Sequence, residues 1–202
     1  ILLAPVDLLW NGGIGTYVKA ATEDHLSVGD RANDAIRVDG RQVRAKVIGE
    51  GGNLGLSQLG RIEAALNGVR VNTDAIDNSA GVDTSDHEVN IKILLNRMIA
   101  SGTLDDAARV PLLESMTDEV AHLVLTDNYD QNRALATSHA QSAGLLDVHQ
   151  RYLRSLESAG RLDRAIEFLP NDDELAERSH RGAGLTVPEL AVVLAYTKIT
   201  IE

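Results

Sequence analysis

Short apolar runs separated by polar, glycine-rich loops dominate the first part of the chain. Each run is followed by glycine, asparagine or aspartate, which is typical of strands that end in turns. The three runs cover residues 6–10, 45–48 and 69–71. Between the second and third runs, Leu59, Ile62 and Leu66 recur at helical spacing and predict an amphipathic helix. Strand, glycine turn, helix and strand form a βαβ unit, whose parallel strands place ligands at their carboxyl ends.

Apolar residues in the second part recur mostly at spacings of three and four, which predicts helices. The predicted helical segments are residues 113–124, 145–156 and 162–169. Pro170 should end the third of them. Thr186 and Glu189 form a capping box with Pro188 in the first turn, which predicts the start of a final helix.

Composition changes near residue 103 and suggests where the two parts meet. Of the 17 glycines, 13 lie within residues 1–102, and the remaining stretch carries 9 basic against 17 acidic side chains. A glycine-rich part followed by an acidic, glycine-poor part favours an α/β unit joined to a helical region. We therefore expect an α/β fold class, with one domain over residues 1–103 and a second, all-helical region over residues 104–202.

The overall composition excludes several classes of protein. A formal net charge of −11 argues against binding to a phosphate backbone, so no nucleic-acid partner is expected. The absence of cysteine excludes disulfide scaffolds, cysteine-zinc sites and thiol nucleophiles, and fits a reducing, cytoplasmic location. No apolar run has the length of a membrane helix, so no membrane partner is expected. Since the chain opens with Ile1 inside an apolar run, we expect a piece of a longer protein.

The loop from Gly49 to Gly55 allows two interpretations. Glycines after a strand can let backbone amides approach a pyrophosphate, and Asp74 stands where a ribose-binding acid would follow. The dinucleotide fingerprint G-x-G-x-x-G is not completed, however, because Leu54 occupies the place of its third glycine. The alternative is a tight strand-to-helix turn, which the periodicity favours.

Residues 72–83 are rich in short polar side chains, which suits either a ligand site or an Asx-rich turn before a helix. Ser85 and Glu88 form a second capping box, so Ser85 is interpreted as an N-cap, a ligand-binding hydroxyl, or both. A metal site is not predicted, because His87 has no ligand partner three or four residues further on. The polar run 127–132 also lacks the spacing of a calcium loop.

Three segments resemble a known family. Residues 46–53 and 73–82 are similar to the second half of the coenzyme domain of glutamate dehydrogenases, where the family has E-G-A-N and N-A-G-G motifs. Residues 7–19 resemble the large bacterial NAD-specific members. The likeness covers roughly residues 1–130 and continues more loosely to residues 184–191. It implies a partial doubly wound, Rossmann-like parallel sheet, with NAD as cofactor and oxidative deamination of L-glutamate to 2-oxoglutarate and ammonium as the reaction.

The resemblance also implies roles for individual positions. Ser85 matches a serine that holds the side-chain carboxylate of the substrate. The positions that match residues beside the coenzyme are Asn11, Gly12, Gly13, Gly51, Gly52, Asn53, Asn78 and Ser79. No catalytic residue is matched, because the family's catalytic lysine and aspartate belong to an upstream domain. The implied partners are therefore the missing N-terminal portion of the same chain and further copies in a homo-oligomer.

A second class of function stays open at this point. Without proton-transfer residues, the chain could serve as a non-catalytic nucleotide-binding or assembly module with a helical arm. The upstream sequence distinguishes the two, because only the enzyme requires a glycine-flanked lysine motif about one domain earlier.

Overall fold

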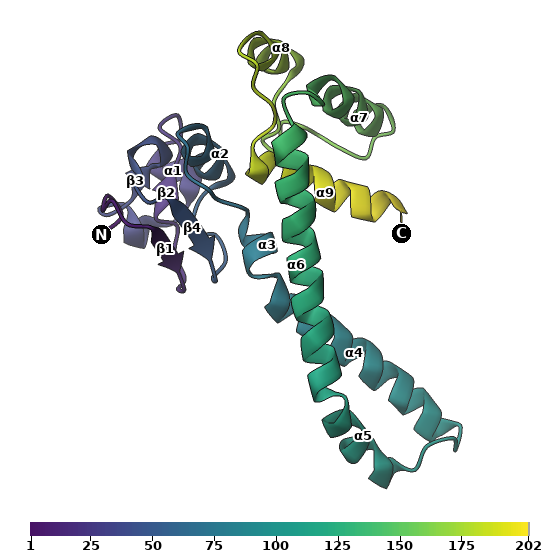
Figure 1. The fold of residues 1–202 in the computed structure, drawn as a ribbon. Coiled ribbons are helices and arrows are strands. Elements are labelled where there is room, and N and C mark those ends of the chain that lie inside the picture. The colour runs from purple at the N-terminus through teal and green to yellow at the C-terminus, as the bar shows by residue number, and fades with distance from the viewer. Residues whose placement is uncertain (202) are drawn as a thin grey trace.

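The computed structural model describes residues 1–201 as a small α/β unit followed by an extended array of helices (Figure 1). The strands are β1 (Leu8–Asn11), β2 (Val18–Lys19), β3 (Val38–Asp39) and β4 (Val47–Glu50). The short helices of this unit are α1 (His25–Val28), η1 (Arg31–Asn33), η2 (Gly40–Gln42), α2 (Gln58–Leu66) and α3 (Asp74–Asp77). The helical array comprises α4 (Ser79–Ala100), η3 (Asp106–Ala108), α5 (Arg109–Ser115), α6 (Thr117–Gln141), α7 (Leu146–Ser158), α8 (Asp172–His180) and α9 (Val187–Ile201).

Two small parallel sheets form the α/β unit. β1 pairs in parallel with β4, with Asn11 opposite Glu50, so the carboxyl ends of both strands lie at the same edge of the sheet. β2 pairs with β3. The third predicted strand is reduced to one parallel bridge from Arg70 to Val47. This run is short because Gly68, at φ 89°, precedes it closely and the polar segment follows at once.

A compact apolar core holds the α/β unit together. Val18, Ile48 and Leu56 are almost completely buried, and Ala64 of α2 is fully buried beneath them. The predicted helix around Leu59 is therefore confirmed as α2, whose buried face covers this core. This packing fixes the loop between β4 and α2, where the candidate site lies.

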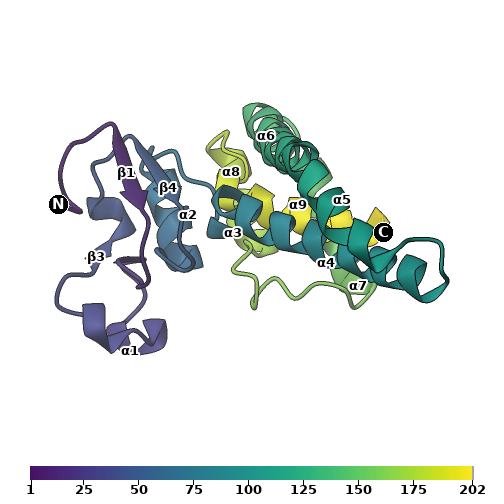
Figure 2. The ribbon, with the colours of Figure 1, turned by 90° about the horizontal axis from the view of Figure 1, so that it is seen from below.

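The helical region has a long projecting arm and a compact end. α4 packs against α6, and α5 closes the far end of the arm (Figures 1 and 2). α7, α8 and α9 gather at the other end of α6 around the fully buried Leu153. Gln58 of α2 donates a hydrogen bond to the Pro188 carbonyl at 3.2 Å and so connects the α/β unit to α9. None of the helices described for residues 1–201 combines the length and the apolar character of a membrane span.

Two helix predictions for this region were wrong. The predicted helix over residues 113–124 is divided at Met116, where α5 ends and α6 begins. Residues 162–169 form turns, because Asp163 accepts hydrogen bonds from two following amides and Phe168 adopts φ 55° before Pro170. The start of the final helix is confirmed, since Glu189 accepts from both the amide and the hydroxyl of Thr186 at 2.7 Å. The predicted division at residue 103 stays a prediction; this residue lies in the connection from α4 to η3.

Candidate functional site

The carboxyl ends of β1 and β4 meet in two interlocked loops. The amides of Gly51 and Gly52 donate to the Asn11 carbonyl at 2.8 and 3.1 Å. A Cβ atom at Gly52 would lie 2.6 Å from the Gly13 carbonyl oxygen, which is closer than real contacts allow. Glycine is therefore required for the two loops to approach each other.

Two further amides of the loop after β4 donate within the α/β unit as well. Leu54 donates to Asp74 Oδ2 at 2.7 Å, and Leu56 donates to Glu50 Oε1 at 3.2 Å. With these amides engaged and two carboxylates beside them, the loop offers little to a pyrophosphate. Its geometry favours the interpretation as a tight strand-to-helix turn. Leu54 itself adopts φ 58°, a left-handed conformation that glycine would adopt without strain.

Trp10 covers the outer side of this turn. A Cβ atom at Gly49 would lie 2.7 Å from the Trp10 ring, and one at Gly51 would lie 2.4 Å from it. The indole therefore lies directly against the glycine backbone, and it stays 61% exposed to solvent. This contact was not foreseen from the sequence, although Trp10 closes the first apolar run.

A buried ion network anchors the turn to α2. Arg61 donates to both carboxylate oxygens of Glu50, at 2.7 and 2.9 Å, and lies 3.2 Å from Asp74 Oδ1. Glu50 has no exposed surface. Burial raises the pKa of the Glu50 carboxyl, while the hydrogen bonds and charge of Arg61 oppose that rise. This network was missed from the sequence, since Arg61 lies within an otherwise amphipathic helix.

Asn53 and Asn78 are brought together although 25 positions separate them. The Asn78 carboxamide donates to Asn53 Oδ1 at 2.5 Å. Asn78 is the single residue between α3 and α4, and Ser79 opens α4. Both asparagines line a cavity of about 830 Å³ that extends between α4, α6 and α9 towards Lys198. Two exposed or half-buried amides at a cavity are groups that recognise a carboxamide or hydroxyl ligand.

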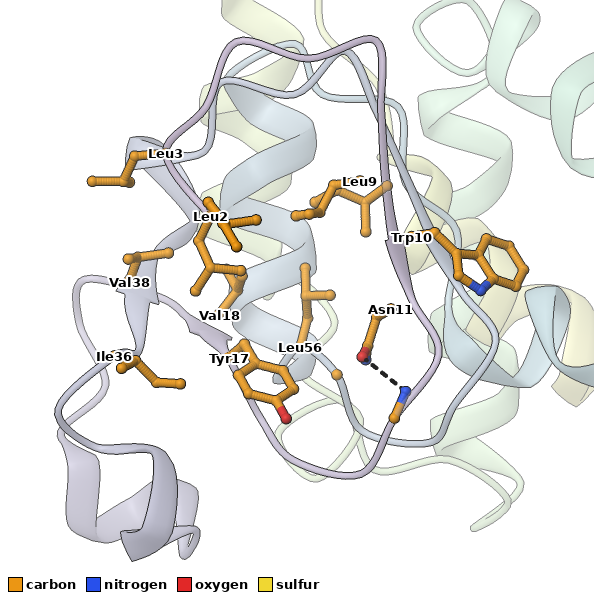
Figure 3. A pocket seen from close by; sticks show the side chains of 14 residues that line it. Leu2, Leu3, Leu9, Trp10, Asn11, Tyr17, Val18, Ile36, Val38 and Leu56 are labelled. Atoms are coloured by element: carbon orange, nitrogen blue, oxygen red, sulfur yellow. Dashed lines mark hydrogen bonds between the residues drawn. The ribbon is translucent and has the colours of Figure 1, made fainter.

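Asn11 lies at the edge of a second, apolar cavity of about 660 Å³ (Figure 3). Leu2, Leu9 and Leu56 contribute to its walls. Asn11 Oδ1 accepts from the Gly13 amide at 3.4 Å, but its buried Nδ2 has no hydrogen-bond partner within residues 1–201. A buried donor without an acceptor is costly, so this amide is suited to a ligand oxygen.

The prediction that Ser85 caps a helix was wrong. α4 begins at Ser79, directly after α3, so Ser85 lies inside the helix rather than at its start. Its hydroxyl is exposed and donates to the Gly81 carbonyl at 3.2 Å. Most of the polar segment 72–83 is therefore helical. Residues 74–77 form α3 and residues 79–83 belong to α4, with Asn78 between the two helices.

His87 has neighbours that the sequence search overlooked. The search looked for partners after His87, whereas Asp83 lies one helical turn before it, with its carboxylate 3.2 Å from Nδ1. Asp127 of α6 completes a cluster whose ligating atoms lie within 4.8 Å of one another, and these residue types could hold a divalent cation. The Asp83 carbonyl, aided by the charges of Asp83 and Asp127, raises the pKa of His87 above its ordinary value.

Comparison with known proteins identifies the family. The family described as "Bacterial NAD-glutamate dehydrogenase, catalytic domain" matches residues 1–138. Proteins named "NAD-specific glutamate dehydrogenase" from Mycobacterium tuberculosis, Pseudomonas aeruginosa and Halomonas elongata are 58%, 55% and 53% identical over all 202 residues. The chain spans 12% of the length of each. The resemblance found in the sequence is thereby confirmed: the chain belongs to the bacterial NAD-glutamate dehydrogenase catalytic-domain family.

Proposed function

We propose that this chain supplies the second half of a Rossmann-like coenzyme domain to an NAD-dependent glutamate dehydrogenase. The reaction is oxidative deamination of L-glutamate to 2-oxoglutarate and ammonium. The observation that carries the proposal is the Asn53–Asn78 pair beside the carboxyl end of β4, in a chain of this family. Ligands of parallel α/β sheets bind at this edge. The family match favours this enzyme over a non-catalytic assembly module, since the matching relatives carry the name of the enzyme.

The residues at this edge suit a dinucleotide bound across the two loops. The unpartnered Asn11 Nδ2 can donate to a ligand oxygen, and the Asn53–Asn78 amides can orient the carboxamide of the nicotinamide. When bound, NAD supplies the acceptor for the hydride that leaves the substrate carbon. The residues proposed to line the coenzyme are Asn11, Gly12, Gly13, Gly51, Gly52, Asn53, Asn78 and Ser79.

The Asn78→Ala variant of the full-length enzyme tests this assignment. Loss of an oriented amide should raise the KM for NAD by roughly tenfold, because a hydrogen bond to the coenzyme disappears. Steady-state kinetics with NAD varied at saturating glutamate measures the effect. Asn67→Ala is the matched control, since Asn67 only caps the far end of α2. An unchanged KM for NAD in the Asn78 variant would remove Asn78 from the coenzyme site.

We also propose that Ser85 holds the side-chain carboxylate of glutamate. Because Ser85 lies inside α4, Ser85→Ala should leave the melting temperature nearly unchanged, alanine being the better helix former. Loss of a hydrogen bond to a charged group should lower kcat/KM for glutamate by roughly tenfold or more. Glutamate kinetics and thermal unfolding of the full-length variant measure the two effects. Unaltered glutamate kinetics would contradict the role.

The proposed enzyme needs parts that lie outside this chain. We propose that the catalytic lysine and aspartate lie in the upstream portion of the same polypeptide, and the much greater length of the relatives is consistent with this. We further propose a cytoplasmic enzyme that assembles as a homo-oligomer.

A further inference from the structure

The polar run from Asp127 to Asn132 lies in the middle of α6, a helix that otherwise packs through buried Val124 and Leu135. Neither the apolar packing nor the proposed coenzyme contacts account for it. Asn128 and Asn132 are four residues apart and therefore share one face of the helix. Both side chains are half-buried, and that face is directed at the junction between α3 and α4.

Asn128 holds this junction with a single carboxamide. Its Nδ2 donates to the Ile76 carbonyl at 2.9 Å and to the Ser79 hydroxyl at 2.8 Å. These two acceptors flank Asn78 on either side in the sequence. Asn128 of α6, 50 positions further along the chain, therefore holds the chain on both sides of Asn78.

Asn132 extends the same connection to the glycine turn. Its Oδ1 accepts from Asn72 Nδ2 at 2.9 Å, and the same nitrogen donates to Asp77 Oδ1 at 2.6 Å. Asp77 Oδ2 in turn accepts from the Glu50 amide at 3.0 Å, at the end of β4. Asn132 also donates to the Asn128 carbonyl at 2.9 Å, so the two asparagines form one unit.

We propose that Asn128 is a positioning residue for the coenzyme site, which fixes the α3–α4 junction so that Asn78 meets Asn53. The inference rests on the proposed function, because it assigns Asn128 an effect on coenzyme binding through Asn78. Hydrogen bonds are directional, whereas apolar contacts at this point would hold the helices together without fixing the junction. Loss of the Asn128 amide would leave the Ile76 carbonyl and the Ser79 hydroxyl without this donor. Polar groups that lose a hydrogen-bond partner inside a contact are costly, so the junction would rearrange.

The test compares Asn128→Ala, Asn78→Ala and the double variant in the full-length enzyme. Asn128→Ala should raise the KM for NAD by roughly the tenfold expected of Asn78→Ala, with the KM for glutamate changed less than about twofold. The double variant should bind NAD little worse than either single variant, because both act on one contact. Thr137→Ala is the control, since Thr137 lies on the same helix and its hydroxyl contacts only the Arg133 carbonyl.

Each result decides the inference. A raised KM for NAD with non-additivity supports it, and an unchanged KM for NAD in Asn128→Ala, with Asn78→Ala impaired, overturns it while leaving the proposed function intact. An unchanged KM in Asn78→Ala overturns the proposed function, and the inference fails with it. If Asn128→Ala raises the KM for NAD and the KM for glutamate in parallel, Asn128 has only a structural role, and the inference is overturned. If Asn128→Ala does not fold, Asn128→Leu, which fills a similar volume but cannot donate a hydrogen bond, is judged by the same criteria.

Discussion

Replacing Glu50 with alanine is expected to lower the free energy of unfolding by about 3–5 kcal/mol, the range for breaking a buried ion pair by removing one partner. Arg61, whose side chain is only 5% exposed, would lose both of its hydrogen bonds to Glu50 and keep Asp74 as its one remaining carboxylate partner. The turn after β4 would also lose the oxygen that accepts from the Leu56 amide. Urea denaturation of this chain, followed by circular dichroism, measures the loss.

Glu88→Ala is the matched control for this prediction. Glu88 pairs with Lys92 on the exposed surface of α4, and such pairs contribute about 0.3–0.5 kcal/mol. Replacing both buried partners, as in Glu50→Leu with Arg61→Met, should recover much of the stability, because no buried arginine is left unpaired and the half-buried Asp74 keeps the Leu54 amide as a donor. A loss in Glu50→Ala no larger than in Glu88→Ala would contradict the buried pair.

A loss of similar size, about 3–5 kcal/mol, is expected for Glu189→Ala at the start of α9. Glu189 is 1% exposed and contacts both terminal nitrogens of Arg178, at 2.6 and 2.7 Å. It also completes the cap of α9 by accepting from Thr186. Removing it breaks an ion pair and a helix cap together.

Glu177→Ala provides the comparison for Glu189, because Glu177 forms an exposed pair with Arg181. Chemical denaturation of both variants should show a loss for Glu189→Ala several times larger. Equal losses would mean that the Arg178 pair is solvated in solution. Either result bears on the compact end of the helical region rather than on the coenzyme edge.

Elements with a strong local signal were predictable from the sequence. The strands at the positions of β1 and β4, the helix α2 and the start of α9 follow from short apolar runs, helical spacing and a capping box. The break at Met116 and the turns over residues 162–169 were not predictable, because the helical spacing of apolar residues continues through both. Before Pro170, Phe168 at φ 55° and the hydrogen bonds to Asp163 replace the helix with turns. Ser85 was misplaced because a capping-box pattern also occurs by chance inside a helix.

The candidate site was predictable only as separate residues. Asn53 and Asn78 were named from family resemblance, but their contact depends on the junction that Asn128 holds. The Glu50–Arg61 pair and the Asp83–His87–Asp127 cluster join residues from different elements. Only the Asp83–His87 pair has a spacing that could be read along one segment; the contacts of Glu50 with Arg61, and of Asp127 with that pair, arise when separate elements dock.

The position of Trp10 gives the chain an optical property at the candidate site. It is the only tryptophan in the 202 residues, and its indole lies against the glycine turn. Tryptophan fluorescence of the isolated chain therefore reports one location, unmixed with signals from the helical arm. Reduced nicotinamide absorbs light where indole emits, so a coenzyme seated across the two loops would quench this emission by energy transfer.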